Sequence, residues 1–168
     1  MKHDNDYTIG LKNIWEVVCY GSDGQEKWRE LNDNLVVTVG LNALLTEFFK
    51  GSSYTATWCI GLKSTGTALA ADTMSSHSSW TEITDYTQSA RPTIALGTPS
   101  AGSVDNTASK ADFSINGTTT IYGAFLVNAS AKGGTGGTLY GVVDFGSSRA
   151  VISGDTLTVT VTLTAASA

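Results

Sequence analysis

The chain has 168 residues, of which 41% are hydrophobic and 15% are charged, and its net charge is −5. This length is sufficient for one domain with a hydrophobic core, and the apolar content excludes a disordered protein. No apolar run approaches the roughly 20 residues of a membrane helix, and the ten basic residues form no cluster. We therefore expect neither membrane insertion nor direct nucleic-acid binding.

The N-terminal segment 1–10, MKHDNDYTIG, is polar and lacks the apolar core of a secretion signal. We expect a flexible N-terminus on a protein that folds where it is made. Thirteen of the 25 charged residues lie within the first 50 positions. The remaining surface depends on Ser, Thr, Asn and Gly, which suits packing against other proteins, a virion or extracellular surface, or plain solubility.

A β-hairpin is predicted over 11–33. Residues 13–20, NIWEVVCY, carry apolar side chains in both phases of a two-residue alternation, and the Asp-Gly pair at 23–24 is the strongest turn signal in the chain. Trp15 and Trp28 place an aromatic ring on each arm. Either both faces of the first strand are covered within the fold, or one face meets a partner chain.

One amphipathic helix is predicted over 39–50. Thr38 is a suitable N-cap, and Gly51 is a natural residue just beyond the last turn. We expect the apolar stripe of this helix to cover an open end or a face of a sheet; the alternative is a groove on a partner. The stripe has helical spacing and consists of Leu41, Leu44, Leu45, Phe48 and Phe49.

The body spanning 34–168 is otherwise typical of β-strands joined by turns. Its last strand, 155–165, alternates apolar residues with threonines, which indicates one buried and one polar face. The turn spacing predicts an all-β sandwich or jelly roll whose single helix closes one open end. Residues 63–90 are too long for an idle connection and are interpreted as a functional loop. The other predicted strands are 54–62, 91–97, 108–115, 118–128 and 137–146.

No catalytic constellation is predicted. A Ser–His–Asp triad needs a histidine, and the chain has only His3 and His77, one near the terminus and one in a hydroxyl-rich loop. No Cys or His spacing suits zinc. We expect a protein that is not an enzyme and holds no cofactor or metal. The aspartates that we assign to turns and the surface, rather than to a calcium site, are Asp105, Asp112, Asp144 and Asp155.

For two other groups of residues we favour a structural role over a functional one. Cys19 and Cys59 lie in apolar strand-like runs, so we expect free buried thiols rather than a disulfide framework. Five aromatic residues have the chemistry to stack on a sugar, although such rings more often fill a core or a subunit interface. They are Trp58, Trp80, Tyr86, Tyr122 and Tyr140.

Several segments together resemble a widespread group of small virion proteins of tailed bacteriophages and prophages. The resemblance extends over most of the chain from about residue 11, and its motifs are structural rather than catalytic. The segments that carry it are 34–52, 72–82 with the Arg-Pro pair at 91–92, 101–115 and 123–163.

Within that group, a β-sandwich of this size resembles a head decoration or cement protein. The resemblance implies a non-enzymatic protein that is made in the host cytoplasm and located on the capsid surface of the virion. It further implies that the protein binds and stabilises the shell of major capsid protein, as a homotrimer or another homo-oligomer. The alternative is a tail-tip or a receptor- or glycan-binding module of a phage tail.

The hairpin is the candidate contact arm of such a protein, and its candidate contact residues are Trp15, Tyr20, Trp28 and Arg29. Adhesion to a repeating shell needs apolar anchors, strand pairing at an edge and multivalency, but no nucleophile. An arm of this kind implies that deletion of residues 1–31 leaves a folded body that no longer attaches to shells. The alternative is that the hairpin simply provides two more strands of the sandwich.

Overall fold

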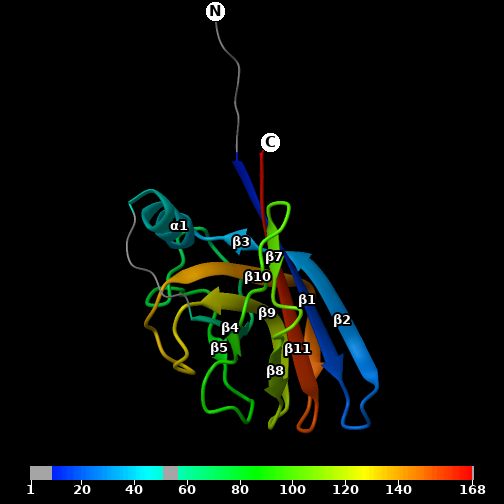
Figure 1. The fold of residues 1–168 in the computed structure, drawn as a ribbon. Helices are drawn as coiled ribbons and strands as arrows, with labels where there is room; N and C mark the ends of the chain where they lie inside the picture. Colours follow the sequence, from blue (N-terminus) through cyan, green and yellow to red (C-terminus); the bar gives the residue numbers. More distant parts are fainter. Residues whose placement is uncertain (1–8, 51–56, 168) are drawn as a thin grey trace, which may run out of the picture.

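Two antiparallel sheets face each other in the computed structural model, which describes residues 9–50 and 57–167 (Figure 1). Sheet A consists of β1 (Ile9–Tyr20), β2 (Glu26–Asp33), β7 (Ser103–Asp105), β8 (Ala111–Ser114) and β11 (Thr156–Ser167). Sheet B consists of β3 (Leu35–Val36), β4 (Trp58–Lys63), β5 (Glu82–Ile83), β6 (Thr93–Ile94), β9 (Thr119–Val127) and β10 (Leu139–Val151). The helix described in these ranges is α1 (Thr38–Lys50). The predicted all-β sandwich with one helix is confirmed.

The strand order shows how the sheets are assembled. Sheet A runs β2-β1-β11-β7, with β8 also paired to β11, and sheet B runs β3-β10-β9-β4-β5, with β6 also paired to β4. Strand β10 extends beyond its predicted end, whereas the strand predicted over 91–97 is reduced to two residues. The start of the strand predicted over 54–62 lies outside the described residues. So do residues 1–8 of the flexible segment predicted over 1–10, whereas Ile9 and Gly10 belong to β1.

The predicted hairpin is part of sheet A. Its first strand, β1, pairs with β2 on one side and with β11 along its entire length on the other, from Ile9 opposite Ser167 to Tyr20 opposite Thr156. The turn contains Gly24 in the left-handed region, with φ of 76°, where the missing Cβ avoids strain. Because β1 lies inside the sheet, the hairpin forms two strands of the sandwich rather than a separate contact arm.

The main core lies between the two sheets. Leu157, Val159 and Val161 of β11 are fully buried there, whereas the threonines between them have the opposite phase. The predicted division of this strand into one apolar and one polar face is therefore confirmed. Trp15 is also fully buried in this core, on the same side of sheet A.

A second core covers the outer face of sheet B. It consists of buried side chains from β4, β9 and β10, packed under residue Val37 and the loop that follows β4. In that loop, Trp80 packs against Phe125 with ring centroids 5.2 Å apart, and its Nε1 donates a hydrogen bond to Asp72 at 2.9 Å. The long segment 63–90 thus has a structural task, because it covers a sheet face that would otherwise be open to water.

The two cysteines lie in different cores. Cys19 belongs to the main core and Cys59 to the second core, and both are buried free thiols, as predicted. Burial raises the pKa of Cys19 to about 11, with a further contribution from the charge of Asp155. The thiolate is therefore disfavoured, and Cys19 is suited to packing rather than to reactivity.

Replacing Trp15 by Ala should lower the free energy of unfolding by about 3–5 kcal/mol, because a large buried ring leaves a cavity. The matched variant is Tyr20→Ala, on the opposite face of the same strand, which should cost about 1 kcal/mol or less. Equilibrium urea unfolding measures both values. Similar small losses for the two variants would contradict the core position of Trp15.

Deletion of residues 1–31 should prevent folding, because it removes β1 and most of β2. The edge of β11 that pairs with β1 then has no hydrogen-bonding partner strand. Circular dichroism and thermal unfolding of the truncated chain provide the measurement. A truncated chain that still unfolds cooperatively would show that the hairpin is dispensable, as a separate arm would be.

Candidate binding surfaces

Helix α1 is attached to the sandwich by its first turn. The Thr38 amide donates a hydrogen bond to the Ala70 carbonyl at 2.9 Å, and the Val37 amide donates to the Tyr140 carbonyl at 3.2 Å. Gly40 is buried directly against the backbone of Tyr140, where any Cβ would overlap the carbonyl group. The helix therefore turns its side with the smallest residue toward β10 and lies over one end of the sandwich (Figure 1).

The apolar stripe of α1 is not buried as we expected. Leu41, Leu44 and Leu45 are 38%, 41% and 51% exposed, and we call these three residues the leucine face. The expectation is wrong for them because the close approach at Gly40 fixes which side of the helix meets the sheet. The structure does not describe the side chains of the other two stripe residues, Phe48 and Phe49.

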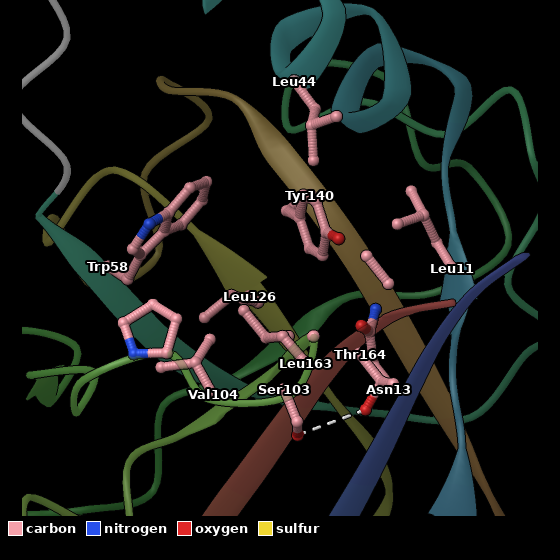
Figure 2. Close-up of a pocket in the computed structure, with 13 residues that line it drawn as sticks. Leu11, Asn13, Leu44, Trp58, Ser103, Val104, Leu126, Tyr140, Leu163 and Thr164 are labelled. Atoms are coloured by element: carbon pink, nitrogen blue, oxygen red, sulfur yellow. Dashed lines mark hydrogen bonds between the residues drawn. The ribbon is translucent and has the colours of Figure 1, made fainter. Parts of the chain in front are cut away.

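An apolar pocket of about 410 Å³ opens beside the leucine face and is lined by residues of both sheets (Figure 2). Leu44 points toward the pocket from α1, above Tyr140. Trp58 and Tyr140, with ring centroids 5.8 Å apart, stand on the side of sheet B, and Leu163 comes from sheet A. None of the 13 lining residues is charged.

Asn13 contributes an amide to this apolar pocket. The residue is 1% exposed, and neither amide atom makes a hydrogen bond within the described structure. Burial raises the pKa of the neighbouring Tyr140 phenol. Apolar walls with a few polar groups are typical of a binding pocket.

The outer face of sheet A is the second candidate surface. Its centre is the row of β11 threonines, which we call the threonine face; Thr160 is only 9% exposed, and the other four, Thr156, Thr158, Thr162 and Thr164, are half-buried. Tyr20, partly exposed, lies opposite Thr156 on β1, and Arg29, exposed, lies one strand farther out, on β2 opposite Val18. Leu31 is 66% exposed on the same side. Charged side chains share this face: Lys12 pairs with Asp33, Arg29 pairs with Glu16, and Asp112 lies opposite Thr158.

The four candidate contact residues are divided between the two sides of sheet A. Trp15 is completely buried and has no surface to offer a partner of the folded chain. Trp28 also faces inward, where its ring packs edge-on against Phe145 at 6.3 Å and its Nε1 donates to the Ala150 carbonyl at 3.3 Å. Only Tyr20 and Arg29 face outward.

Arg29 is held by two carboxylates on its own face of sheet A. It forms ion pairs with Glu16, on β1, and with Glu26, at 2.8 Å. All three side chains are partly exposed, so the pairs fix the orientation of the guanidinium more than they stabilise the fold. The hairpin residues available to a partner are therefore an oriented cation and a tyrosine.

The loop around His77 forms a shallow groove lined by hydroxyl groups, with a volume of about 400 Å³. The imidazole stacks on Trp80 with ring centroids 3.9 Å apart, and its Nδ1 donates a hydrogen bond to the Trp80 carbonyl at 2.9 Å. The nitrogen that a triad would direct toward a carboxylate is thus bonded to the backbone. Of the aromatic residues considered for sugar stacking, Trp80, Tyr86 and Tyr140 are buried.

Buried charges in the described residues form structural pairs. Arg91, 1% exposed, donates to both carboxylate oxygens of Glu82 at 2.9 and 2.7 Å and to the carbonyls of Ala129 and Gly134. The bidentate pair joins Arg91 to β5, and the two carbonyl contacts tie the loop that carries Arg91 to the glycine-rich loop after β9.

Asp155 is not the surface residue that we predicted. It is 2% exposed, and its carboxylate accepts hydrogen bonds from the Ile152 amide at 3.0 Å and from Lys27 at 2.5 Å. The carboxylate therefore fixes the turn between β10 and β11 and connects it to β2. No cluster of His, Cys, Asp or Glu in 9–50 or 57–167 is placed to hold a metal ion.

Comparisons of this chain with protein-family models, with curated proteins and with solved structures found no match. No helix in the described part is both long and apolar enough to span a membrane. The two candidate surfaces are therefore assessed on their own chemistry.

The sequence indicated the leucine face clearly and gave only a weak indication of Asn13 in the pocket. The leucine stripe was visible at helical spacing, and a partner contact was the alternative interpretation. Asn13 was missed, although it shares the inward phase of Trp15 and Val17 on β1. A polar residue at an inward position of an alternating strand is the pattern that would have found it.

Replacing Asn13 by Leu should raise the free energy of unfolding by about 1 kcal/mol or more, because a buried amide without hydrogen bonds is replaced by an apolar group of similar size. The matched variant Asn13→Asp should lower it, because it buries a carboxyl group there. Urea unfolding tests both variants. A loss of stability in Asn13→Leu would show that the amide is hydrogen-bonded in solution.

Proposed function

We propose that this chain is a non-enzymatic structural protein of a phage virion: a capsid decoration or cement protein that binds and stabilises the shell of major capsid protein. The sequence resemblance suggests this class, and the observation that carries the proposal is a pair of surfaces suited to protein contacts: the threonine face, with Tyr20 and Arg29 on the same side of sheet A, and the exposed leucine face. The leucine face is an apolar patch beside an apolar pocket, and most other large apolar side chains of the subunit are buried. Exposed apolar patches of this kind are typical of protein–protein interfaces.

The threonine face is the surface that we assign to the shell. Thr side chains lose little conformational freedom when they are covered, and their hydroxyls donate and accept hydrogen bonds. Tyr20 and Arg29, on the same side of sheet A, are residue types that often carry much of the binding energy at an interface. A rigid sheet that carries such groups fits a flat, repeating protein surface.

The distribution of basic side chains supports a protein partner rather than a nucleic acid. Counterion release from DNA or RNA requires cations that are free to meet phosphates. Six of the ten Lys and Arg residues instead form ion pairs with carboxylates of the chain, and they are Lys12, Lys27, Arg29, Lys63, Arg91 and Arg149.

Shell binding tests this proposal directly. The full chain should co-sediment with shells assembled from the major capsid protein of the phage that carries its gene, and it should raise the heat resistance of those shells. The double variant Tyr20→Ser/Arg29→Ser should bind at least about tenfold more weakly, because it removes two anchors of the threonine face. Tyr122→Ser, on β9 of sheet B, is the control that should bind normally.

A chain that does not bind such shells would contradict the proposed function. Labelled antibody on tails rather than heads in electron micrographs would favour the alternative, a tail-tip or receptor-binding module. Equal binding by the double variant and the wild type would show that the contact lies elsewhere than the threonine face.

A further inference from the structure

We infer that the leucine face packs against the same face of a second copy of this chain, so that the α1 helices of neighbouring subunits meet at the symmetry axis of a homo-oligomer. The inference deepens the proposed function, on which it rests for its biological setting, by identifying the surface through which the subunits associate. It commits this surface to self-association and leaves the threonine face for the shell.

The spacing of the leucines is suited to a helix–helix contact. Leu41, Leu44 and Leu45 are related as i, i+3 and i+4, so their side chains form one ridge along α1. All three are more than a third exposed, although leucine is among the residue types most often buried. Such a ridge is stabilised when a ridge of the same kind packs beside it and both are removed from water.

The absence of charge on this surface favours a second copy as the occupant. Groups close to the axis of a symmetric contact lie near their own equivalents, so charges there would meet like charges. The leucine face and the pocket beside it contain no charged side chain. Glu47, the ionisable residue of α1 whose side chain is described, has its Oε2 atom buried within the subunit.

The position of α1 leaves room for such a contact. The helix is held by its first turn, at Val37, Thr38 and Gly40, and the leucine face follows that turn at one end of the sandwich (Figure 1). Since Leu44 also lines the pocket, a second copy on the leucine face would cover the pocket mouth (Figure 2). Of the threonine face, Thr164 also lines the pocket, whereas Thr156, Thr158 and Thr162 do not and remain half-exposed along sheet A.

Self-association of this kind would also strengthen attachment to a repeating surface. Several threonine faces joined through one α1 contact can engage neighbouring copies of the capsid protein together. The later contacts then form at a high effective concentration, and weak individual contacts suffice for stable attachment.

Sedimentation equilibrium of the full chain tests the inference without shells. The wild type should have a mass that is a multiple of the 17.5 kDa subunit, and Leu41→Ser/Leu45→Ser should sediment as a 17.5 kDa monomer. Both leucines are exposed in the subunit, so the circular dichroism spectrum should not change. Ile152→Ser is the matched control, because Ile152 is 52% exposed in the turn between β10 and β11, at the other end of β11, and it should remain oligomeric.

A cysteine placed on the same face provides a second test that does not depend on weakening the fold. Cys19 and Cys59 are buried, so Leu45→Cys adds an accessible thiol. Mild oxidation should give a disulfide-linked dimer of Leu45→Cys and no such dimer of Ile152→Cys.

The inference is overturned by a wild type that remains monomeric at its highest soluble concentration, or by an oligomer that persists in Leu41→Ser/Leu45→Ser. Equal crosslinking of the two cysteine variants would also overturn it. These outcomes are separate from those of the shell experiment. A monomer that binds shells would leave the proposed function intact, whereas an α1-dependent oligomer that ignores shells would contradict only that function.

Discussion

Strands β1 and β11 pair over twelve residues, and this pairing joins the two ends of the described chain inside sheet A. The register places Trp15 opposite Val161 in the core, while the alternate residues of both strands face outward. A shift of one residue would turn the threonines of β11 inward and the apolar residues outward. The main core and the threonine face therefore depend on the same set of backbone hydrogen bonds. The pairing also brings Leu11 and Asn13 beside Leu163, at the end of the sandwich where the pocket opens.

Sheet B is covered on both faces, which is unusual for a simple sandwich. Its strand β4 is buried almost throughout, because Ile60 faces sheet A and Cys59 faces the second core. The long loop after β4 and the first turn of α1 provide that second cover. Gly40 then decides how α1 lies, since only a residue without a Cβ allows the helix to approach the Tyr140 backbone so closely. The leucine face is exposed as a consequence of this packing.

The two candidate surfaces differ in chemistry and thus in the contacts they suit. The leucine face is apolar, is located at one end of the sandwich and gains most when water is excluded from it. The threonine face is extended and hydrogen-bonding, and it is held rigid by the ladder beneath it. A virion protein that must hold its own copies together and also attach to a shell needs both kinds of surface. The proposed function and the self-association through α1 are therefore compatible in one subunit.

The sequence by itself determined the fold class, the helix, the free thiols and the two faces of β11, because these follow from local periodicity and turn residues. It also located the leucine stripe and the hairpin. Only the tertiary structure decided that the hairpin is part of sheet A, with β1 inside the sheet and β2 at its edge, that Asp155 is buried, and that the leucine face is exposed. Each of these depends on which distant segment lies opposite a residue, such as Tyr140 behind Gly40. Periodicity shows that a helix or strand has two different sides, but only the packing of distant segments determines where each side points.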